Sequence, residues 1–213
     1  MKNFILIAMS IGLFSMGQAQ KINLGKAASA VTKGAQALSF TNEDAKRLSK
    51  ESVDWMDAHN PVAGKNSPYT KRLNRVFGKH QNEDGLKLNY KVYLVTDINA
   101  FACADGSVRV FSSLMDLMTD DELLAVIGHE IGHVKNEDTK DAIKSAYMRA
   151  AAQDAVSSAS GVVRKLSDTE LGEMANAILD AKHSKKQESQ ADEYSYNFMK
   201  KHGYNVVAVY TAF

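Results

Sequence analysis

The motif His129-Glu130-Ile131-Gly132-His133 constrains this chain more than any other stretch. On an α-helix, residues four positions apart lie on one face, one turn above the other, so both imidazoles can bind one metal ion. Glu130 then projects beside that ion, where its carboxylate can take a proton from water. The alternative is a chance match of two histidines that serve packing alone. We interpret the motif as a metal site.

The sequence around the motif predicts a largely buried helix from Asp120 to Asn136. Thr119 is a good N-cap, and Glu122 three residues later completes a capping box. Apolar residues recur at three- and four-residue spacing and predict a buried face: Leu123, Leu124, Ile127, Ile131 and Val134. The two histidines are therefore expected on a helix that packs into the core.

Two histidines do not complete a catalytic zinc site, which uses three protein ligands and leaves a position for water. The metzincin pattern does not fit, because Asn136 and Thr139 stand where it needs Gly and His. Glu188 is the candidate third ligand. Asp192, four residues on, lies on the same helical face and can accept the second ring N–H of a histidine ligand. The alternative for this segment is a solvated helix face.

The first 19 residues have the pattern of a signal peptide. Lys2 precedes the apolar run from Phe4 to Met16, and Gly17-Gln18-Ala19 supplies small residues for cleavage before Gln20. The alternative is a membrane anchor, but the run is short for a span and is interrupted by small and polar residues. We therefore predict an exported, periplasmic bacterial protein that is soluble after cleavage.

Composition narrows the function classes further. Lys and Arg number 26 against 25 Asp and Glu, so loss of Lys2 with the signal peptide leaves no net charge and nothing argues for a nucleic-acid partner. The single cysteine, Cys103, excludes an internal disulfide. It lies far from the signal region, so it is not a lipoprotein's acylated cysteine. We expect Cys103 to be a small residue beside the site rather than a catalytic nucleophile.

The order of predicted elements is that of an α+β domain. Residues 20–40, rich in Ala, Gly, Ser and Lys, are expected to form a flexible lead-in, with an amphipathic surface-binding helix as the alternative. Residues 41–213 are expected to form one domain. Strands are predicted at Leu88 to Thr96 and Ser107 to Phe111. Helices are predicted from Thr41 to Asn60-Pro61, from Ser67-Pro68 past Phe77, from Ser112 or Ser113 to Met118, from Asp120 to Asn136, from Thr139 to about Ala159, from Ser167 to Ala181 and from Ser184 to His202.

Four motifs in order resemble the HtpX and CAAX prenyl protease family of gluzincin zinc metallopeptidases, in particular its small periplasmic members. His129-Glu130-xx-His133 is followed 55 residues later by Glu188-xx-Ala191-Asp192. Asn99-Ala100-Phe101-Ala102, and then Asp105-Gly106 to Phe111, are similar to the family's stretch before the metal helix. The likeness covers about Thr41 to Phe213.

The resemblance implies a mainly helical, zincin-like metallopeptidase domain with a small β-sheet whose edge strand borders the active site. It implies one Zn²⁺ per chain, with His129, His133 and Glu188 as ligands. Glu130 would act as general base and acid, and Asp192 would orient a histidine ligand. The implied function is endopeptidase hydrolysis of unfolded or misfolded exported proteins.

The resemblance also implies how a polypeptide substrate binds. Asn99 would lie beside the substrate, although a turn asparagine is the alternative. The strand with Ser107, Val108, Arg109 and Val110 would be the edge on which an extended substrate adds a strand. Association with the membrane or with outer-membrane assembly proteins is a further expectation, and the oligomeric state is left open.

One departure from the family pattern bears on activity. Family members usually carry a later His-Pro pair whose histidine assists the oxyanion, but His202 is followed by Gly203 and the sequence reaches Phe213 without such a pair. Either the domain continues beyond Phe213, or another group serves, with these candidates: His183, Tyr194, Tyr196 and Tyr204. The rival function is a non-catalytic or latent zinc-binding chaperone on the same scaffold.

Overall fold

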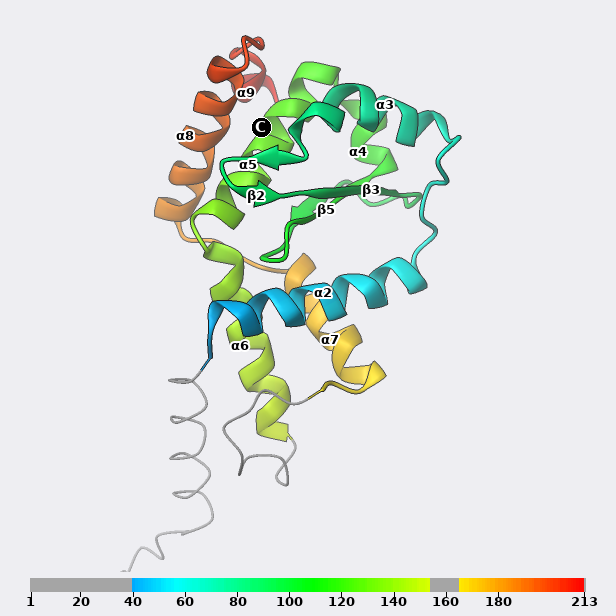
Figure 1. The fold of residues 1–213 in the computed structure, drawn as a ribbon, viewed down its shortest axis with the longest axis vertical. Helices are drawn as coiled ribbons and strands as arrows, with labels where there is room; N and C mark the ends of the chain where they lie inside the picture. The colour runs from blue at the N-terminus through cyan, green and yellow to red at the C-terminus, as the bar shows by residue number, and fades with distance from the viewer. Residues whose placement is uncertain (1–39, 154–164, 213) are drawn as a thin grey trace, which may run out of the picture.

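The computed structural model describes residues 40–153 and 165–212 (Figure 1). The predicted signal peptide 1–19, the lead-in up to residue 39 and the predicted helical residues 154–159 lie outside the described residues. The helices are α2 (Asn42–His59), α3 (Pro68–Phe77), η1 (Gly78–His80), α4 (Ser112–Leu117), α5 (Asp120–Lys135), α6 (Asp138–Gln153), α7 (Asp168–Leu179), α8 (Lys185–Lys201) and α9 (Ala208–Thr211). The strands are β1 (Asn82–Glu83), β2 (Leu86–Lys87), β3 (Asn89–Tyr93), β4 (Ala100–Ala102) and β5 (Ser107–Phe111).

Side-chain caps fix where several helices begin. In each capping box, a Ser or Thr oxygen accepts the N–H three residues on, and the side chain of that residue accepts the N–H of the cap. Capping boxes begin α2, α5, α7 and α8, with these pairs: Thr41 and Asp44, Thr119 and Glu122, Ser167 and Glu170, Ser184 and Gln187. These starts confirm the helix positions predicted from the sequence.

The three-stranded sheet has the order β3-β5-β4, with β5 parallel to β3 and antiparallel to β4. The prediction that Ser107 to Phe111 forms an edge strand is therefore wrong. Both sides of β5 are paired and all five of its residues are buried, so Ser107, Val108, Arg109 and Val110 offer no free edge to a substrate. Among the described residues, the outer strand beyond β5 is β4, a three-residue strand that was too short to predict from alternation.

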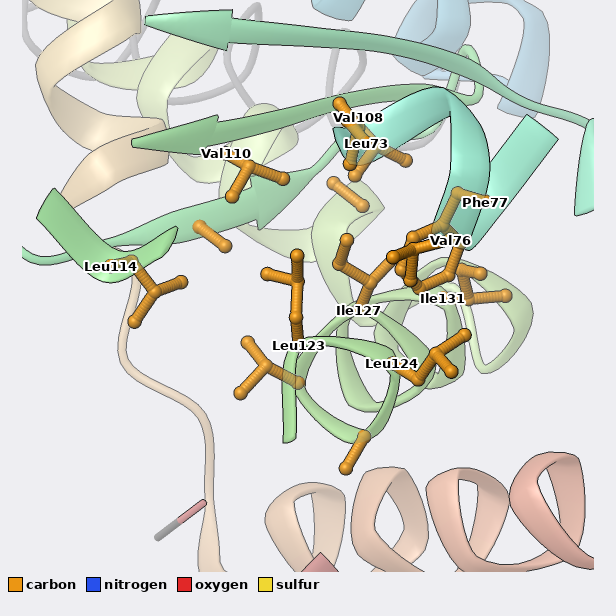
Figure 2. Packing of buried hydrophobic residues seen from close by; sticks show 14 of the residues in the cluster. Leu73, Val76, Phe77, Val108, Val110, Leu114, Leu123, Leu124, Ile127 and Ile131 are labelled. Atoms are coloured by element: carbon orange, nitrogen blue, oxygen red, sulfur yellow. The ribbon is translucent and has the colours of Figure 1, made fainter. Parts of the chain in front are cut away.

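Both faces of this sheet are covered, which explains the burial of β5. On one face, Val108 and Val110 pack with α3 and α5, and Figure 2 shows side chains of these elements pointing toward one another. On the other face, Tyr93, Phe101 and Phe111 pack against Val53 and other residues of α2 and α7. Figure 1 shows α2 crossing beneath the sheet, with α6 and α7 beyond it and α8 beside α5.

Arg109 ties the sheet to α2 from within the core. Its side chain is 2% exposed, and it donates to Asp57 from Nε (2.8 Å) and Nη2 (2.9 Å). Lys91 and the Tyr93 hydroxyl donate to the same carboxylate at 2.6 and 2.7 Å. Burial alone would raise the pKa of Asp57, but the hydrogen bonds from Arg109, Lys91 and Tyr93 outweigh it and lower the pKa to about 2. Arg109 therefore holds the scaffold together.

Replacing Asp57 by Asn is expected to lower the free energy of unfolding at pH 7 by about 3 kcal/mol, because it leaves the buried Arg109 unpaired. Since folding lowers the pKa of Asp57, the carboxylate stabilises the fold above its unfolded pKa, and this stabilisation is lost as the pH falls from about 4 through about 2. Urea unfolding at pH 7 and at lower pH measures both effects. Asp54→Asn, at an exposed pair with Lys50, is the control and should cost under about 0.5 kcal/mol. A loss below about 1 kcal/mol for Asp57→Asn contradicts this role.

Short elements account for most of the remaining differences from the sequence prediction. The predicted strand from Leu88 to Thr96 is limited to Asn89–Tyr93, since the Leu94 N–H bonds Pro61 instead. The turn predicted from Asn82 to Gly85 is the turn of the β1–β2 hairpin. Among the helices in the described ranges, none combines the length and apolar character needed to cross a membrane.

Candidate metal centre

Helix α5 places the rings of both motif histidines next to each other, as its sequence predicts. His129 and His133 are 6% and 3% exposed, so the helix buries them. Their rings lie nearly perpendicular, and the two Nε2 atoms are 3.0 Å apart. Two ring nitrogens that approach this closely, each with a lone pair, can bind one ion between them.

Helix α8 lies close against α5 because small residues face each other across the contact. A Cβ added to Gly132 would lie 3.0 Å from the Ala191 Cα atom, and one added to Gly128 would lie 3.3 Å from the Ser195 hydroxyl. The Ser195 hydroxyl also donates to the Ala125 carbonyl of α5 at 2.7 Å. This close approach sets the position of the first turn of α8 relative to the histidines.

The first turn of α8 carries Glu188 to the two histidines. Its Oε2 atom lies 3.3 Å from His129 Nε2, and its Oε1 atom lies 3.9 Å from His133 Nε2. One donor atom of each of the three residues lies within 4.8 Å of the others, so the three could hold a metal ion. Two imidazoles and a carboxylate are also the donor set of known catalytic zinc sites. The predicted ligands are thus brought together from two helices.

A carboxylate faces the second nitrogen of each histidine. His129 Nδ1 lies 2.9 Å from Asp192 Oδ1, where the sequence predicted it, and His133 Nδ1 lies 2.9 Å from Asp138 Oδ2. A carboxylate can only accept, so each Nδ1 carries the proton and each Nε2 keeps its lone pair for a metal. Burial lowers the pKa of His133, against the opposing effect of Asp138, and favours the neutral ring that binds metal.

Asp138 is a candidate site residue that no sequence motif indicated. Glu137 has a φ of 62°, and this left-handed turn returns the chain so that Asp138 begins α6 beside His133. Gln187 Nε2 donates to the other carboxylate oxygen of Asp138 at 2.9 Å, which links α6 to α8. The available signal was an acidic residue five positions after His133, at the start of the next predicted helix.

Replacing Asp138 or Asp192 by Asn is expected to weaken metal binding by about 10- to 100-fold. The larger loss is expected for Asp138, because its side chain is 7% exposed, whereas that of Asp192 is 55% exposed. At the exposed position, water can replace the carboxylate as the hydrogen-bond acceptor of His129 Nδ1. Competition with a chromophoric chelator measures the affinity. Asp141→Asn, at an exposed position of α6, is the control. Native affinity in both the Asp138 and Asp192 variants rules out the positioning role.

Glu130 projects into a cavity of about 220 Å³ beside the histidines. Burial of its carboxyl raises the pKa of Glu130 to about 8, with a further contribution from Glu188 and an opposing hydrogen bond from the Ala102 N–H. The Ala102 N–H therefore positions the Glu130 carboxylate from the edge of the sheet. The polar part of the lining includes Asn99, His183 and the candidate ligands, and the apolar part includes Phe101, Ala142, Ile143, Ile178 and Leu179.

Two other predictions concern residues near this cavity. Cys103 lines it but is 1% exposed, and burial raises the pKa of its thiol well above the ordinary range, so a thiolate nucleophile is disfavoured. Of the residues considered for stabilising the oxyanion, His183 lines the cavity and stacks on His133, with ring centroids 3.9 Å apart. The hydroxyls of the other candidates Tyr194 and Tyr204 bond Asp84 and His80 instead, and Tyr196 lines a different hollow.

Comparison with known proteins identifies relatives along most of the chain. The family model described as peptidase family M48 matches residues 69–213. Metalloprotease YcaL of Escherichia coli (strain K12) is 42% identical over 169 residues, which cover 79% of this chain and 66% of YcaL. Metalloprotease LoiP of the same organism is 37% identical over 210 residues, which cover 98% of this chain and 83% of LoiP.

A shorter match joins the chain to the family that the motifs resemble. Protease HtpX of Actinobacillus pleuropneumoniae serotype 5b (strain L20) is 43% identical over 51 residues, or 22% of this chain and 18% of HtpX. The aligned part spans just under two thirds of YcaL, whereas it spans most of LoiP. The resemblance predicted from the four motifs is confirmed: the chain belongs to peptidase family M48, and it is a metalloprotease.

Proposed function

We propose that this chain is a zinc-dependent endopeptidase that hydrolyses unfolded or misfolded exported proteins. The observation that carries the proposal is the convergence of His129 Nε2, His133 Nε2 and the Glu188 carboxylate, with Glu130 directed into the adjoining cavity. Two imidazoles and a carboxylate match Zn²⁺ in ligand type, and three protein ligands leave a position open. The signal-peptide pattern of residues 1–19 supports export to the periplasm.

Each residue then has a separate task in hydrolysis. When bound, Zn²⁺ supplies a positive charge that polarises a peptide carbonyl, lowers the pKa of water to about 7 and favours the ionised form of Glu130. Glu130 accepts the proton of the attacking water and passes it to the leaving amine. Asp138 and Asp192 hold the two imidazoles in the tautomer in which Nδ1 carries the proton and Nε2 carries the lone pair.

The edge of β4 is where we propose that the substrate docks. The Phe111 N–H donates to the Asn99 carbonyl, and the Cys103 N–H donates to Ser107, so the backbone groups of residues 99 and 103 face β5. In an antiparallel ladder the groups of alternate residues face the other side, so those of Ala100 and Ala102 point away from β5. Because the Ala102 N–H donates to Glu130, we propose that a peptide pairs with the Ala100 N–H and carbonyl and with the Ala102 carbonyl. An extended peptide can pair with this edge, which favours unfolded chains over folded ones.

Stabilisation of the developing oxyanion falls to groups that line the same cavity. Asn99 and His183 both line it and both carry a side-chain N–H donor. His183 is held by stacking on His133, with an interplanar angle of 19°. We propose that His183 donates to the developing oxyanion and that Asn99 contacts the substrate.

Hydrolysis of unfolded β-casein tests this function against the rival, a zinc-binding chaperone without turnover. The zinc-loaded protein should cleave casein into peptides, a chelator should stop cleavage, and added Zn²⁺ should restore it. Cleavage products are measured by mass spectrometry. Chelator-sensitive suppression of casein aggregation without any new peptides would instead establish the chaperone. Cleavage that persists at the full rate in chelator would contradict the zinc mechanism.

A further inference from the structure

A second group of metal-binding side chains lies at the other end of α8 from Glu188. It comprises His80, Glu83 and His202, whose donor atoms all lie within 4.8 Å of one another. His80 Nδ1 lies 3.2 Å from Glu83 Oε2, and His202 Nε2 lies 3.1 Å from the same oxygen. Ligand atoms bound tetrahedrally to Zn²⁺ at 2.0–2.1 Å are roughly 3.3 Å apart, so the spacing about the carboxylate already suits a common ion.

His80 is held rigidly in a binding orientation. Its Nε2 atom lies 2.7 Å from the Tyr204 hydroxyl, and its backbone carbonyl accepts from the Tyr90 hydroxyl at 2.9 Å. The ring also contacts the rings of Phe77 and Phe198 edge-on. Without an ion, the Glu83 carboxylate accepts the proton of His80 Nδ1 and the Tyr204 hydroxyl donates to Nε2. When an ion binds, the proton moves to Nε2, which then donates to Tyr204, and Nδ1 gains the lone pair that a metal requires. A partner on the second ring nitrogen is the usual arrangement of metal-binding histidines.

Burial makes this group unlike a chance surface cluster. His80 and Glu83 are 1% and 4% exposed, whereas the His202 side chain is 24% exposed and gives a path for an ion to enter. The three residues come from separate segments: the end of η1, strand β1 and the C-cap of α8. A metal ion bound by all three side chains would therefore cross-link the β1–β2 hairpin to the end of α8.

We propose that His80, Glu83 and His202 form a second binding site for a divalent transition-metal ion, with Zn²⁺ as the expected occupant. Two imidazoles and one carboxylate suit Zn²⁺, Cu²⁺ and Ni²⁺ and do not suit Ca²⁺ or Mg²⁺, which prefer oxygen ligands. The ion would clip the hairpin to α8, which also carries Glu188 and Asp192. This site lies outside the cavity of the first centre, and the proposal does not depend on peptidase activity.

Lys201 sets the strength of this site. Its Nζ atom lies 2.5 Å from Glu83 Oε1 and 2.9 Å from Asp84 Oδ1, and its side chain is 52% exposed. An ammonium on the same carboxylate opposes a dication, although the exposed side chain can move to Asp84 or to water. We therefore expect weaker binding here than at His129, His133 and Glu188, with an affinity that Lys201 limits.

The test is a Zn²⁺ titration of the metal-free protein, with bound metal measured by equilibrium dialysis and elemental analysis. The native chain should bind two ions in two separate steps. His202→Gln, which keeps an amide donor for Glu83, should bind one ion and cleave casein at the native rate. One ion in the native chain, or two ions in His202→Gln, would overturn the proposal. Glu188→Ala should lose the tighter ion alone, so failure of either site is distinguishable.

Lys201→Gln supplies a second variant that leaves all three proposed ligands in place. Removing the ammonium should tighten the weaker ion by about tenfold and leave the tighter ion unchanged. A merely structural hydrogen-bonded cluster would show no such gain. Unchanged or weaker binding of the second ion in Lys201→Gln would overturn the proposal, whatever the folding of the His202 variant.

Discussion

Replacing Glu130 by Gln is expected to lower the rate of casein cleavage by about a thousandfold while zinc stays bound. A general base contributes about 10²- to 10⁴-fold to a rate, and an amide cannot accept the proton of water at neutral pH. The substitution keeps the size of the side chain and an oxygen that can accept the Ala102 N–H. Single-turnover cleavage and metal analysis of the same preparation measure the two quantities.

The control for this variant is Glu193→Gln, the same change at an exposed position of α8. It should keep both the native rate and the native zinc content. Cleavage by the Glu130 variant within about tenfold of the native rate would mean that another group accepts the proton. Loss of zinc together with activity would mean instead that Glu130 holds the ion.

Replacing Glu188 by Ala is expected to weaken zinc binding by more than about 100-fold and to abolish cleavage. This loss should exceed that of the Asp138 and Asp192 variants, because those residues orient ligands while Glu188 supplies one. With Glu188 removed, His129 and His133 remain as two donors. Chelator competition measures the affinity, and Glu193→Ala on the same helix is the control.

His183→Ala distinguishes the proposed ligand set from an alternative at the same place. His133, Asp138 and His183 also have donor atoms within 4.8 Å of one another. If the ion binds there, the His183 variant should lose it and the Glu188 variant should keep it. If His129, His133 and Glu188 are the ligands, the Glu188 variant should lose zinc. His183→Ala should then keep zinc and lose cleavage.

Local sequence rules were sufficient for the helices that carry the site. The capping box predicted at Thr119, the apolar spacing of α5 and the helix predicted from Ser184 to His202 placed both helices to within a residue or two. The four-residue spacing of His129 and His133 then placed them on one face of α5. The same spacing placed Glu188 and Asp192 on one face of α8. Such rules depend on hydrogen bonds and packing within one helix, so they can be read from one segment.

The pairing of the strands could not be predicted in the same way. Whether Ser107–Phe111 lies at the edge or in the centre depends on where β3 and β4 pair with it, and these contacts join distant segments. All five residues of β5 are buried because helices cover both faces of the sheet. The apolar and polar residues of the strand therefore could not show whether it lies at an edge. The contacts of Asp138 and of Glu83 could not be predicted for the same reason. A turn at Glu137 brings Asp138 to His133, and a tertiary contact brings His202 to Glu83.

The most direct test of the metal centre is a crystal structure of the zinc-loaded protein, with anomalous diffraction recorded on both sides of the zinc absorption edge. We expect an anomalous peak within about 2.0–2.2 Å of His129 Nε2, His133 Nε2 and a carboxylate oxygen of Glu188. A peak that lies away from these three atoms, or a Glu188 carboxylate turned from the ion, would show that these residues are not the ligand set.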